Sequence, residues 1–387
     1  MMDITSDNFV LLRTVYQGDN FGSSLQAFAL KRYVEEQFGM SCLVIENKEK
    51  GLELVKQNIT RKTINFIKSF CSPRLFVREW SVYLGKGKST PKYSDGIIQK
   101  FAEYTESQII PVYLSKKDLK KKAKNIGCKK VITGSDQVWS PVGPSLNYFN
   151  FLCFSPKSKN ISYAASLGVD KVPYYNYLSF KKKIKRIKYV SVREENAQVL
   201  LKKQFHVDAT CCLDPVLLVG TEFWKQHMTQ RWSENYVFCY FLNCPSVVAL
   251  EKIRYYQNRG IKVIVLSRMP FAEWDASVEI LDDVGPFDFL SYVCNANAVL
   301  TDSFHGMAFS IVFSKDFFVF ERDYGKSIPQ VSRITSLLTM LNIEGRYISD
   351  GSTASNPEAL NYSTIQSKLE EYRVKSAYFL SEAMKDE

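Results

Sequence analysis

The histidine in the stretch Thr301–Gly306 is the residue best placed for acid–base chemistry. The chain has only three histidines, at positions 206, 227 and 305, so few side chains titrate near neutral pH. His305 follows a short apolar strand and precedes an apolar run typical of a helix. A strand-to-helix loop presents backbone N–H groups and a positive dipole end, which bind phosphate or carboxylate. The alternatives are that Asp302 and Ser303 cap the helix and that His305 is a core imidazole.

Polar residues also follow other predicted strands. Lys130–Thr133 is a strand that ends in Gly134–Gln137, which is either a second ligand-facing loop or only a turn. Tyr189–Val192 ends at Arg193, whose guanidinium is placed either to meet an anion at the next helix end or to pair with Glu194 or a neighbouring carboxylate at the surface. Phe9–Val15 runs into a glycine- and Asx-rich loop that suits tight turns.

Strands and helices alternate along the chain, which predicts an α/β fold with parallel sheets. Because 387 residues exceed what one hydrophobic core usually supports, we expect two domains. The first covers residues 1–187, with a helical insertion at about 50–125, and the second covers 188–345, with a linker near 185–190. A helix within 356–385 is predicted to pack at the domain seam.

Capping signals locate two helices. Ser23 is predicted to cap a helix that runs through Phe38 and stops at Gly39. Ser363–Gln366 matches a capping box, and the helix that follows has an apolar face formed by Ile365, Leu369, Tyr372 and Phe379. The loop after the first strand lacks G-x-G-x-x-G, so we predict no dinucleotide site there.

The net charge of +11 indicates an anionic partner. Lys116–Lys130 contains eight lysines, and Lys181–Lys188 contains six basic residues in eight positions. Each run alone is typical of a solvated helix face, but two runs in one half of the chain favour a basic surface near anionic lipid. No motif that reads nucleic acid is present, and aromatic residues do not interleave with the basic runs, so no nucleic-acid partner is expected.

Cysteine usage and hydropathy indicate the compartment. The nine cysteines include no CxxC pair, and adjacent Cys211 and Cys212 are too close for an ordinary disulfide. No ligand spacing suggests a metal site, the first residues do not resemble a signal peptide, and no apolar run is long enough to cross a bilayer. We therefore expect a soluble, reduced, cytoplasmic protein.

Six motifs, taken in order, resemble the polysaccharide pyruvyl transferase family over residues from about 10 to about 345. They are N-F-G-S-S-L-Q-A-F-A-L (20–30), G-S-D-Q-V-W (134–139), I-S-Y-A-A-S-L-G (161–168), S-V-R-E-E (191–195), L-D-P-V-L-L (213–218) and T-D-S-F-H-G (301–306). The resemblance implies a GT-B-like arrangement of two Rossmann-like domains with the active site in the interdomain cleft. It also implies transfer of a pyruvyl group from phosphoenolpyruvate, the co-substrate, to sugar hydroxyls, with release of phosphate and no further cofactor.

The resemblance assigns roles to residues on the donor side. His305 and Arg193 match family positions linked to phosphoenolpyruvate binding and catalysis. Better-studied members carry an arginine where this chain has Ser303, so Arg322 or Arg333 is expected to supply the missing cation. We expect His305 to act as the general acid or phosphate partner, Arg193 to grip the donor, and Ser303 with Gly306 to donate hydrogen bonds.

On the acceptor side, Asp136 is a further catalytic candidate, and five residues are expected to bind the sugar: Asp19, Asn20, Gln26, Ser135 and Trp139, the last as a stacking surface. The acceptor is expected to be a polysaccharide sugar or its lipid-linked precursor, so peripheral contact with the inner face of an anionic membrane fits the basic surface. Two alternatives stay open: a GT-B glycosyltransferase with a nucleotide-sugar donor, and a non-catalytic anion-binding protein.

Overall fold

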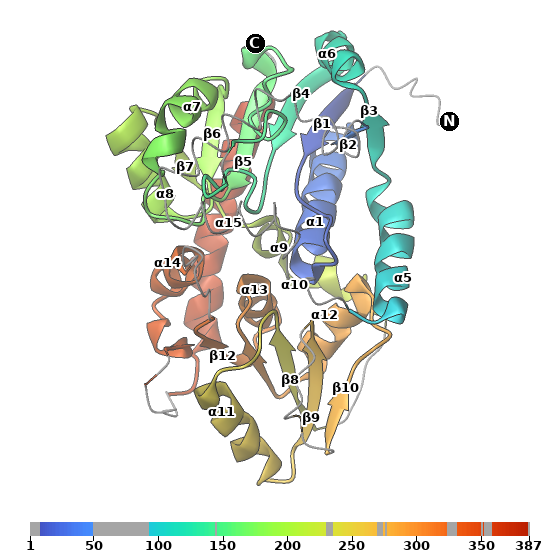
Figure 1. Ribbon diagram of the computed structural model, residues 1–387, viewed down its shortest axis with the longest axis vertical. Helices are drawn as coiled ribbons and strands as arrows, with labels where there is room; N and C mark the ends of the chain where they lie inside the picture. Colours follow the sequence, from blue (N-terminus) through green and yellow to red (C-terminus); the bar gives the residue numbers. More distant parts are fainter. Residues whose placement is uncertain are drawn as a thin grey trace, which may run out of the picture.

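The computed structural model describes residues 8–48, 93–143, 145–229, 235–268, 274, 277–322, 331–349, 351 and 358–385. Across these ranges the chain forms two parallel sheets with helices around them (Figure 1). The α/β fold with two Rossmann-like sheets, expected of a GT-B-like protein, is confirmed.

The first sheet has seven strands among the described residues, in the order β3-β2-β1-β4-β5-β6-β7. Every pairing in it is parallel. Every residue of β1 and β5 is buried, and the apolar run Phe9–Leu12 of β1 is typical of a strand covered on both faces. The strands are β1 (Phe9–Arg13), β2 (Ser41–Asn47), β3 (Val112–Leu114), β4 (Cys128–Thr133), β5 (Asn160–Ala165), β6 (Tyr189–Val192) and β7 (Thr210–Cys211).

The second sheet, within the same described ranges, has six parallel strands in the order β10-β9-β8-β11-β12-β13. The sequence predicted β11 as the short apolar strand before His305, and it did not predict the short edge strands β10 and β13. The strands are β8 (Tyr236–Phe241), β9 (Lys262–Ser267), β10 (Val278–Ile280), β11 (Ala298–Thr301), β12 (Asp316–Phe320) and β13 (Tyr347–Ile348).

The chain passes from the first sheet to the second later than predicted. Strand β6 pairs with β5 and β7 pairs with β6, so both belong to the first sheet. The boundary predicted at residue 187 therefore falls inside that sheet. The sequence did not reveal this, because an apolar strand after a helix has the same sequence pattern in either domain. The predicted insertion at 50–125 also ends too late, since β3 joins the sheet; residues 50–92 of it lie outside the described residues.

The two helices that capping signals located in the sequence, α1 and α15, are confirmed within a few residues. Helix α1 begins after Asn20, whose side chain accepts a hydrogen bond from the Ser23 N–H, so Asn20 is the cap that we assigned to Ser23. Gly39 ends α1 in the left-handed conformation, as predicted. The other helices are α5 (Asp95–Tyr104), η1 (Thr105–Ile109), α6 (Lys116–Lys124), η2 (Lys157–Lys159), α7 (Tyr174–Ile184), α8 (Glu195–Leu200), η3 (Leu201–Phe205), α9 (Pro215–Leu218), α10 (Gly220–Lys225), α11 (Val247–Gln257), α12 (Pro286–Asn295), α13 (Phe304–Val312), α14 (Ser332–Leu341), η4 (Glu344–Arg346) and α15 (Tyr362–Met384), and α1 itself covers Phe21–Phe38.

One hydrophobic core joins the two sheets through α1. This helix lies between them in Figure 1 and is buried along most of its length. The ring of Phe21 stacks on Phe289 of α12, with 5.2 Å between ring centroids, and lies 4.7 Å from Phe101 of α5. The two halves of the chain are therefore packed together, which fixes the residues at the ends of their strands.

Helix α15 runs along both halves of the molecule (Figure 1). Near its start, Gln366 donates a hydrogen bond to the carbonyl of Ile311 in α13. Just beyond its end, the carbonyl of Lys385 accepts one from Lys130 in β4. The helix is capped by Asn361 and not by Ser363, because the Asn361 side chain accepts from the Thr364 N–H.

No helix in the described part of the chain is both long and apolar enough to span a membrane.

Candidate active site

A cavity of about 410 Å³ lies where the carboxyl ends of strands from both sheets meet. The first half of the chain contributes Gln17 from the loop after β1, Ser23 from the first turn of α1, and Asp136 after β4. The second sheet contributes His305 after β11 and Arg322 after β12, and α14 adds Arg333. The carboxyl edge of parallel strands is where open α/β sheets bind ligands. The predicted loops are thus brought together around one space.

His305 occupies the first turn of α13 and is only 4% exposed. Its Nε2 lies 3.8 Å from Oδ2 of Asp214 and has no hydrogen-bond partner among the described residues. A Cβ at Gly22 of α1 would lie 2.0 Å from the imidazole Cγ, so only glycine lets the helix approach the ring this closely. Packing therefore holds the imidazole in place. Because Nε2 has no hydrogen-bond partner among the described residues, His305 is not a core imidazole with both nitrogens satisfied.

Asp214 lies beneath His305 and is almost fully buried. Its Oδ1 caps α9 by accepting from the Val216 N–H at 3.1 Å. Its Oδ2 accepts from Nη1 of Arg193 at 2.5 Å and from Oγ of Ser135 at 3.1 Å. Burial raises the pKa of this carboxyl, but His305 and Arg193 outweigh that effect and hold the pKa below its usual range. The carboxylate is therefore ionised when the site works near neutral pH.

Arg193 lies behind the cavity wall and does not line the cavity. Its guanidinium packs on the Phe304 ring, 4.2 Å from the centroid, and lies 3.6 Å from Asp136 and 3.7 Å from Glu194. Burial lowers its pKa, but the surrounding carboxylates more than reverse this and raise the pKa. In this arrangement Arg193 neutralises buried carboxylates, and its direct grip on the donor stays a prediction.

Asp136 is positioned by an unusual backbone. At Gly134, with φ of 122°, a Cβ would lie 2.0 Å from the Tyr163 carbonyl, so the loop requires glycine. Asp136 itself has φ of 60°, and its Oδ2 accepts from Oγ of Ser23 at 2.6 Å. Burial raises the pKa of Asp136, but Arg193, His305 and Arg333 lower it further than burial raises it. Asp136 therefore presents a fixed negative charge at the cavity.

The second sheet supplies the cations that line the cavity. Arg322 donates to Oδ2 of Asp302 at 3.0 Å and to its carbonyl at 2.6 Å. Arg333 of α14 places Nη1 3.9 Å from Oδ1 of Asp136. Ser303 also lines the cavity and is the N-cap residue of α13, although its side chain makes no capping bond. These are the two arginines that the sequence nominated to replace the missing cation.

Two neighbouring residues of the β11 loop have structural roles. Asp302 does not cap α13, because its carboxylate accepts from the N–H groups of Leu242 and Asn243 and so anchors the loop after β8. A Cβ at Gly306 would lie 2.4 Å from Oγ1 of Thr301, so this glycine permits close approach of α13 to β11. As a residue of the first helical turn, Gly306 still has an N–H without an intrahelical acceptor.

The predicted acceptor residues divide into two groups. Asn20 lines the cavity, and Asp19 lines an adjacent one. Gln26, Ser135 and Trp139 are fully buried and line neither. The stacking surface expected at Trp139 is not met, because its ring stacks on Phe151 and its Nε1–H donates to the Asn150 carbonyl.

Gln26 ties the loops together. Its Nε2 donates to Thr14, and its Oε1 accepts from the Ser135 N–H at 3.2 Å. It therefore joins α1 and the end of β1 to the loop after β4, and positions the site without reaching into it.

Sequence reasoning did not assign Ser23, Asp214 or Glu194 to the site. Glu194 is buried beside Arg193, and its Oε1 accepts from Ser166. Burial raises the pKa of Glu194 despite the nearby guanidinium. The Asp-Pro pair at 214–215 is a helix-start signal, and Asp214 does cap α9. That signal does not indicate that the same carboxylate also pairs with Arg193 in the site. In the described part of the chain, no group of three or more His, Cys, Asp or Glu residues is arranged to hold a metal ion.

Two parallel sheets with a cavity lined by a histidine and two arginines between their strand ends define a two-domain α/β protein with a candidate ligand site at the strand ends. A family model described as polysaccharide pyruvyl transferase matches residues 20–324. The chain belongs to this family and is a transferase, and pyruvyl transfer is the general reaction that the family supports. No curated protein sequence matches the chain significantly.

Solved structures with similar folds include three that cover nearly the whole chain. *S. aureus* MnaA with UDP is 10% identical, with a TM-score of 0.48 and coverage of 94% of this chain and 87% of that one. The *Methanocaldococcus jannaschii* UDP-GlcNAc 2-epimerase with UDP-GlcNAc and UDP is 12% identical, with a TM-score of 0.42 and coverage of 94% and 92%. *E. coli* heptosyltransferase WaaC with ADP is 11% identical, with a TM-score of 0.38 and coverage of 95% and 99%. Identities this low concern the fold alone.

Proposed function

We propose that this protein transfers a pyruvyl group from phosphoenolpyruvate to hydroxyls of a sugar in a polysaccharide or its lipid-linked precursor, releasing phosphate. The observation that carries the proposal is the cavity that His305, Arg322 and Arg333 line together. Membership of the family supports the reaction class. The donor carries a carboxylate and a phosphate, and two arginines with a helix start match two anionic groups.

The reaction requires a proton donor and anion binders. A proton adds to the methylene carbon of phosphoenolpyruvate, and the carbon that carries the phosphate becomes electrophilic. One sugar hydroxyl attacks this carbon and loses its proton, which replaces the one added to the methylene carbon. The C–O bond to phosphate then breaks with its electron pair on the phosphate oxygen. A second hydroxyl attacks to close the cyclic ketal, and its proton goes to the departing phosphate. The products are the ketal and inorganic phosphate, so the atoms balance without any redox partner.

Each group in the cavity has a role in this scheme. His305 delivers the proton, and its Nε2 lies 3.8 Å from the ionised carboxylate of Asp214. Arg322 and Arg333 bind the phosphate and carboxylate of the donor, with Ser303 as a hydroxyl donor. Asp136 accepts a hydrogen bond from the attacking sugar hydroxyl, a role that suits a carboxylate with a lowered pKa.

The lysine-rich segments do not contribute to this cavity. The lysines of α6 lead towards the start of β4, and those at the end of α7 lead towards the start of β6, so they lie at the amino ends of the first sheet (Figure 1). The cavity lies at the carboxyl ends. We assign these lysines to peripheral contact with anionic lipid, which would bring the enzyme to a lipid-linked acceptor on the cytoplasmic face of a membrane.

The first experiment is a thermal-shift comparison with phosphoenolpyruvate and with a panel of nucleotide sugars. A ligand at a hundred times its dissociation constant adds about 2.7 kcal/mol of stability. We expect phosphoenolpyruvate alone to stabilise the wild type, and Arg333→Ala to lose this effect. Arg259→Ala, which removes an exposed arginine stacked on Tyr255, is the control and keeps it. Stabilisation by a nucleotide sugar and not by phosphoenolpyruvate would refute the proposal in favour of a glycosyltransferase.

A further inference from the structure

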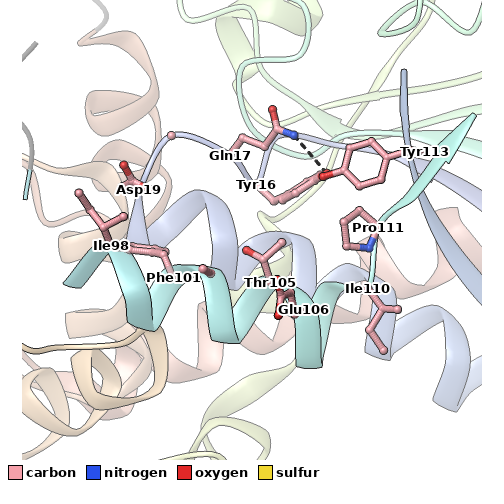
Figure 2. Close-up of a pocket in the computed structure, with 12 residues that line it drawn as sticks. Tyr16, Gln17, Asp19, Ile98, Phe101, Thr105, Glu106, Ile110, Pro111 and Tyr113 are labelled. Atoms are coloured by element: carbon pink, nitrogen blue, oxygen red, sulfur yellow. Dashed lines mark hydrogen bonds between the residues drawn. The ribbon is translucent and has the colours of Figure 1, made fainter. Parts of the chain in front are cut away.

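A second cavity, of about 580 Å³, adjoins the first and has a different chemical character. It lies between the loop after β1 and the helices α5 and η1, and we call it the α5 groove. Figure 2 shows Tyr16 and Tyr113 along one side of it and Phe101, Thr105 and Glu106 along the other. Gln17 and Gly18 line both cavities, so the α5 groove continues from the candidate active site across one loop.

The charge of the α5 groove is opposite to that of the protein as a whole. The chain carries a net charge of +11, yet the described residues that line the groove include Asp19 and Glu106 and neither lysine nor arginine. The active-site cavity, in contrast, is lined by Arg322 and Arg333 as well as by His305, against one carboxylate, that of Asp136. An anionic ligand would be repelled by the groove and attracted to the cavity. The two spaces therefore select for different ligands.

The groove combines exposed rings with hydrogen-bonding groups. Tyr113 is 53% exposed and Ile110 is 43% exposed, which are large values for such apolar side chains. The hydroxyl of Tyr16 accepts a hydrogen bond from the side chain of Gln17 at 3.3 Å, and Thr105 and Glu106 add polar atoms on the opposite side (Figure 2). Apolar faces flanked by carboxylates, an amide and hydroxyls match a neutral sugar, which has C–H faces and a rim of hydroxyls.

The loop between the two spaces is held in place from the second half of the molecule. Arg268, just after β9, donates hydrogen bonds to the carbonyls of Gly18 and Asp19. Gly18 has φ of 93° and Asp19 has φ of 50°, so the loop adopts a tight left-handed path that these carbonyl contacts stabilise. The wall shared by the cavity and the α5 groove is thus a fixed part of the site.

We propose that the α5 groove binds the sugar units of the acceptor next to the one that is modified, so that the enzyme prefers a neutral oligosaccharide chain over a single sugar. This inference rests on the proposed function for the identity of the reaction, but the binding itself needs neither donor nor turnover. The anionic donor binds on one side of the Gln17–Gly18 wall and the uncharged part of the acceptor chain on the other.

The test is direct binding, measured by calorimetry with the full chain and without phosphoenolpyruvate. The probes are neutral oligosaccharides of one to six hexose or N-acetylhexosamine units. We expect affinity to rise with chain length and Tyr113→Ala to weaken binding of the longer chains roughly tenfold or more. Tyr378→Ala, which removes a tyrosine that is 66% exposed on α15, is the matched control and leaves binding unchanged.

Three results would overturn the inference. They are binding to no neutral oligosaccharide, equal loss of single-sugar and long-chain binding in Tyr113→Ala, and tighter binding of a deacetylated, positively charged chain than of its N-acetylated form. The last would identify the groove as a cation site formed by Asp19 and Glu106. Failure of the proposed function is distinguishable, because it would abolish the effect of phosphoenolpyruvate in the thermal-shift experiment and leave length-dependent sugar binding intact.

Discussion

Replacing Asp214 with asparagine tests the charge cluster beneath the cavity. The carboxylate is 1% exposed and accepts from Arg193 at 2.5 Å, and the amide keeps its size while removing its charge. Removal of one partner from a buried ion pair costs about 3–5 kcal/mol, since the other charge stays buried. Asp136 and Glu194 remain 3.6 Å and 3.7 Å from the guanidinium, so we expect the lower end, about 3 kcal/mol.

The measurement is the free energy of unfolding in urea at pH 7, with Asp208→Asn as the control. The Asp208 side chain is 83% exposed in its pair with Lys202, so its loss should cost about 1 kcal/mol or less. Because the pKa of Asp214 is lowered in the folded protein, its contribution is present above the unfolded value of about 3.9 and is lost as the pH falls through the folded value. The difference in unfolding free energy between wild type and Asp214→Asn should therefore become smaller below about pH 4.

Two outcomes would refute this reasoning. One is a decrease in unfolding free energy no larger than that of the Asp208→Asn control. The other is a gap that stays constant from pH 7 to the acid limit of folding, which would assign the effect to shape and not to charge. Loss of the α9 cap does not confuse the result, because asparagine caps helices about as well as aspartate.

Three further predictions concern the same site. His305→Ala should lower the rate of pyruvyl transfer about 10²-fold, the usual scale for a positioned acid, and near-full turnover would contradict its role. Gly22→Ala should also lower turnover, because the new Cβ would lie 2.0 Å from the imidazole. The control Gly143→Ala, whose new Cβ would lie 3.8 Å from its nearest atom, should not lower it. Equal activities of the two variants would refute the packing argument. The stability of Glu194→Gln relative to wild type should rise as the pH rises from about 4 to 7. Because the folded pKa of Glu194 is raised, its carboxyl contributes stability below the unfolded pKa of about 4.3. That contribution is lost as the pH rises through the folded pKa. Urea unfolding at the two pH values measures this, and a constant difference would contradict it.

The sequence predicted the strands that carry the site because each is a short apolar run followed by small or polar residues. β4 before Gly134, β6 before Arg193 and β11 before Asp302 all follow this pattern. The strand pattern does not say which sheet a strand joins, and β6 with β7 was assigned to the wrong domain for that reason. Very short edge strands such as β13 bury too few residues to leave a periodic signal.

Residue type alone did not separate residues that face the cavity from those behind it. Trp139 and Asp136 belong to one motif, but the loop turns the aspartate towards the cavity and the tryptophan into the core. Arg193 has the chemistry of an anion binder and was expected to act as one. Its position among three carboxylates became visible only in the folded chain, because those carboxylates come from different strand ends.

The pairs that define the site join residues that are distant in sequence. Ser23 and Asp136 are 113 positions apart and hydrogen-bonded at 2.6 Å, and His305 lies beside Asp214 from another sheet. Spacing within a motif carries no information on such pairs, whereas two sheets with their carboxyl ends facing each other bring the motifs together. The position of His305 therefore depends on the packing of α1 between the sheets. At Gly22, a single added methyl group would disturb both the packing of α1 and the position of the imidazole.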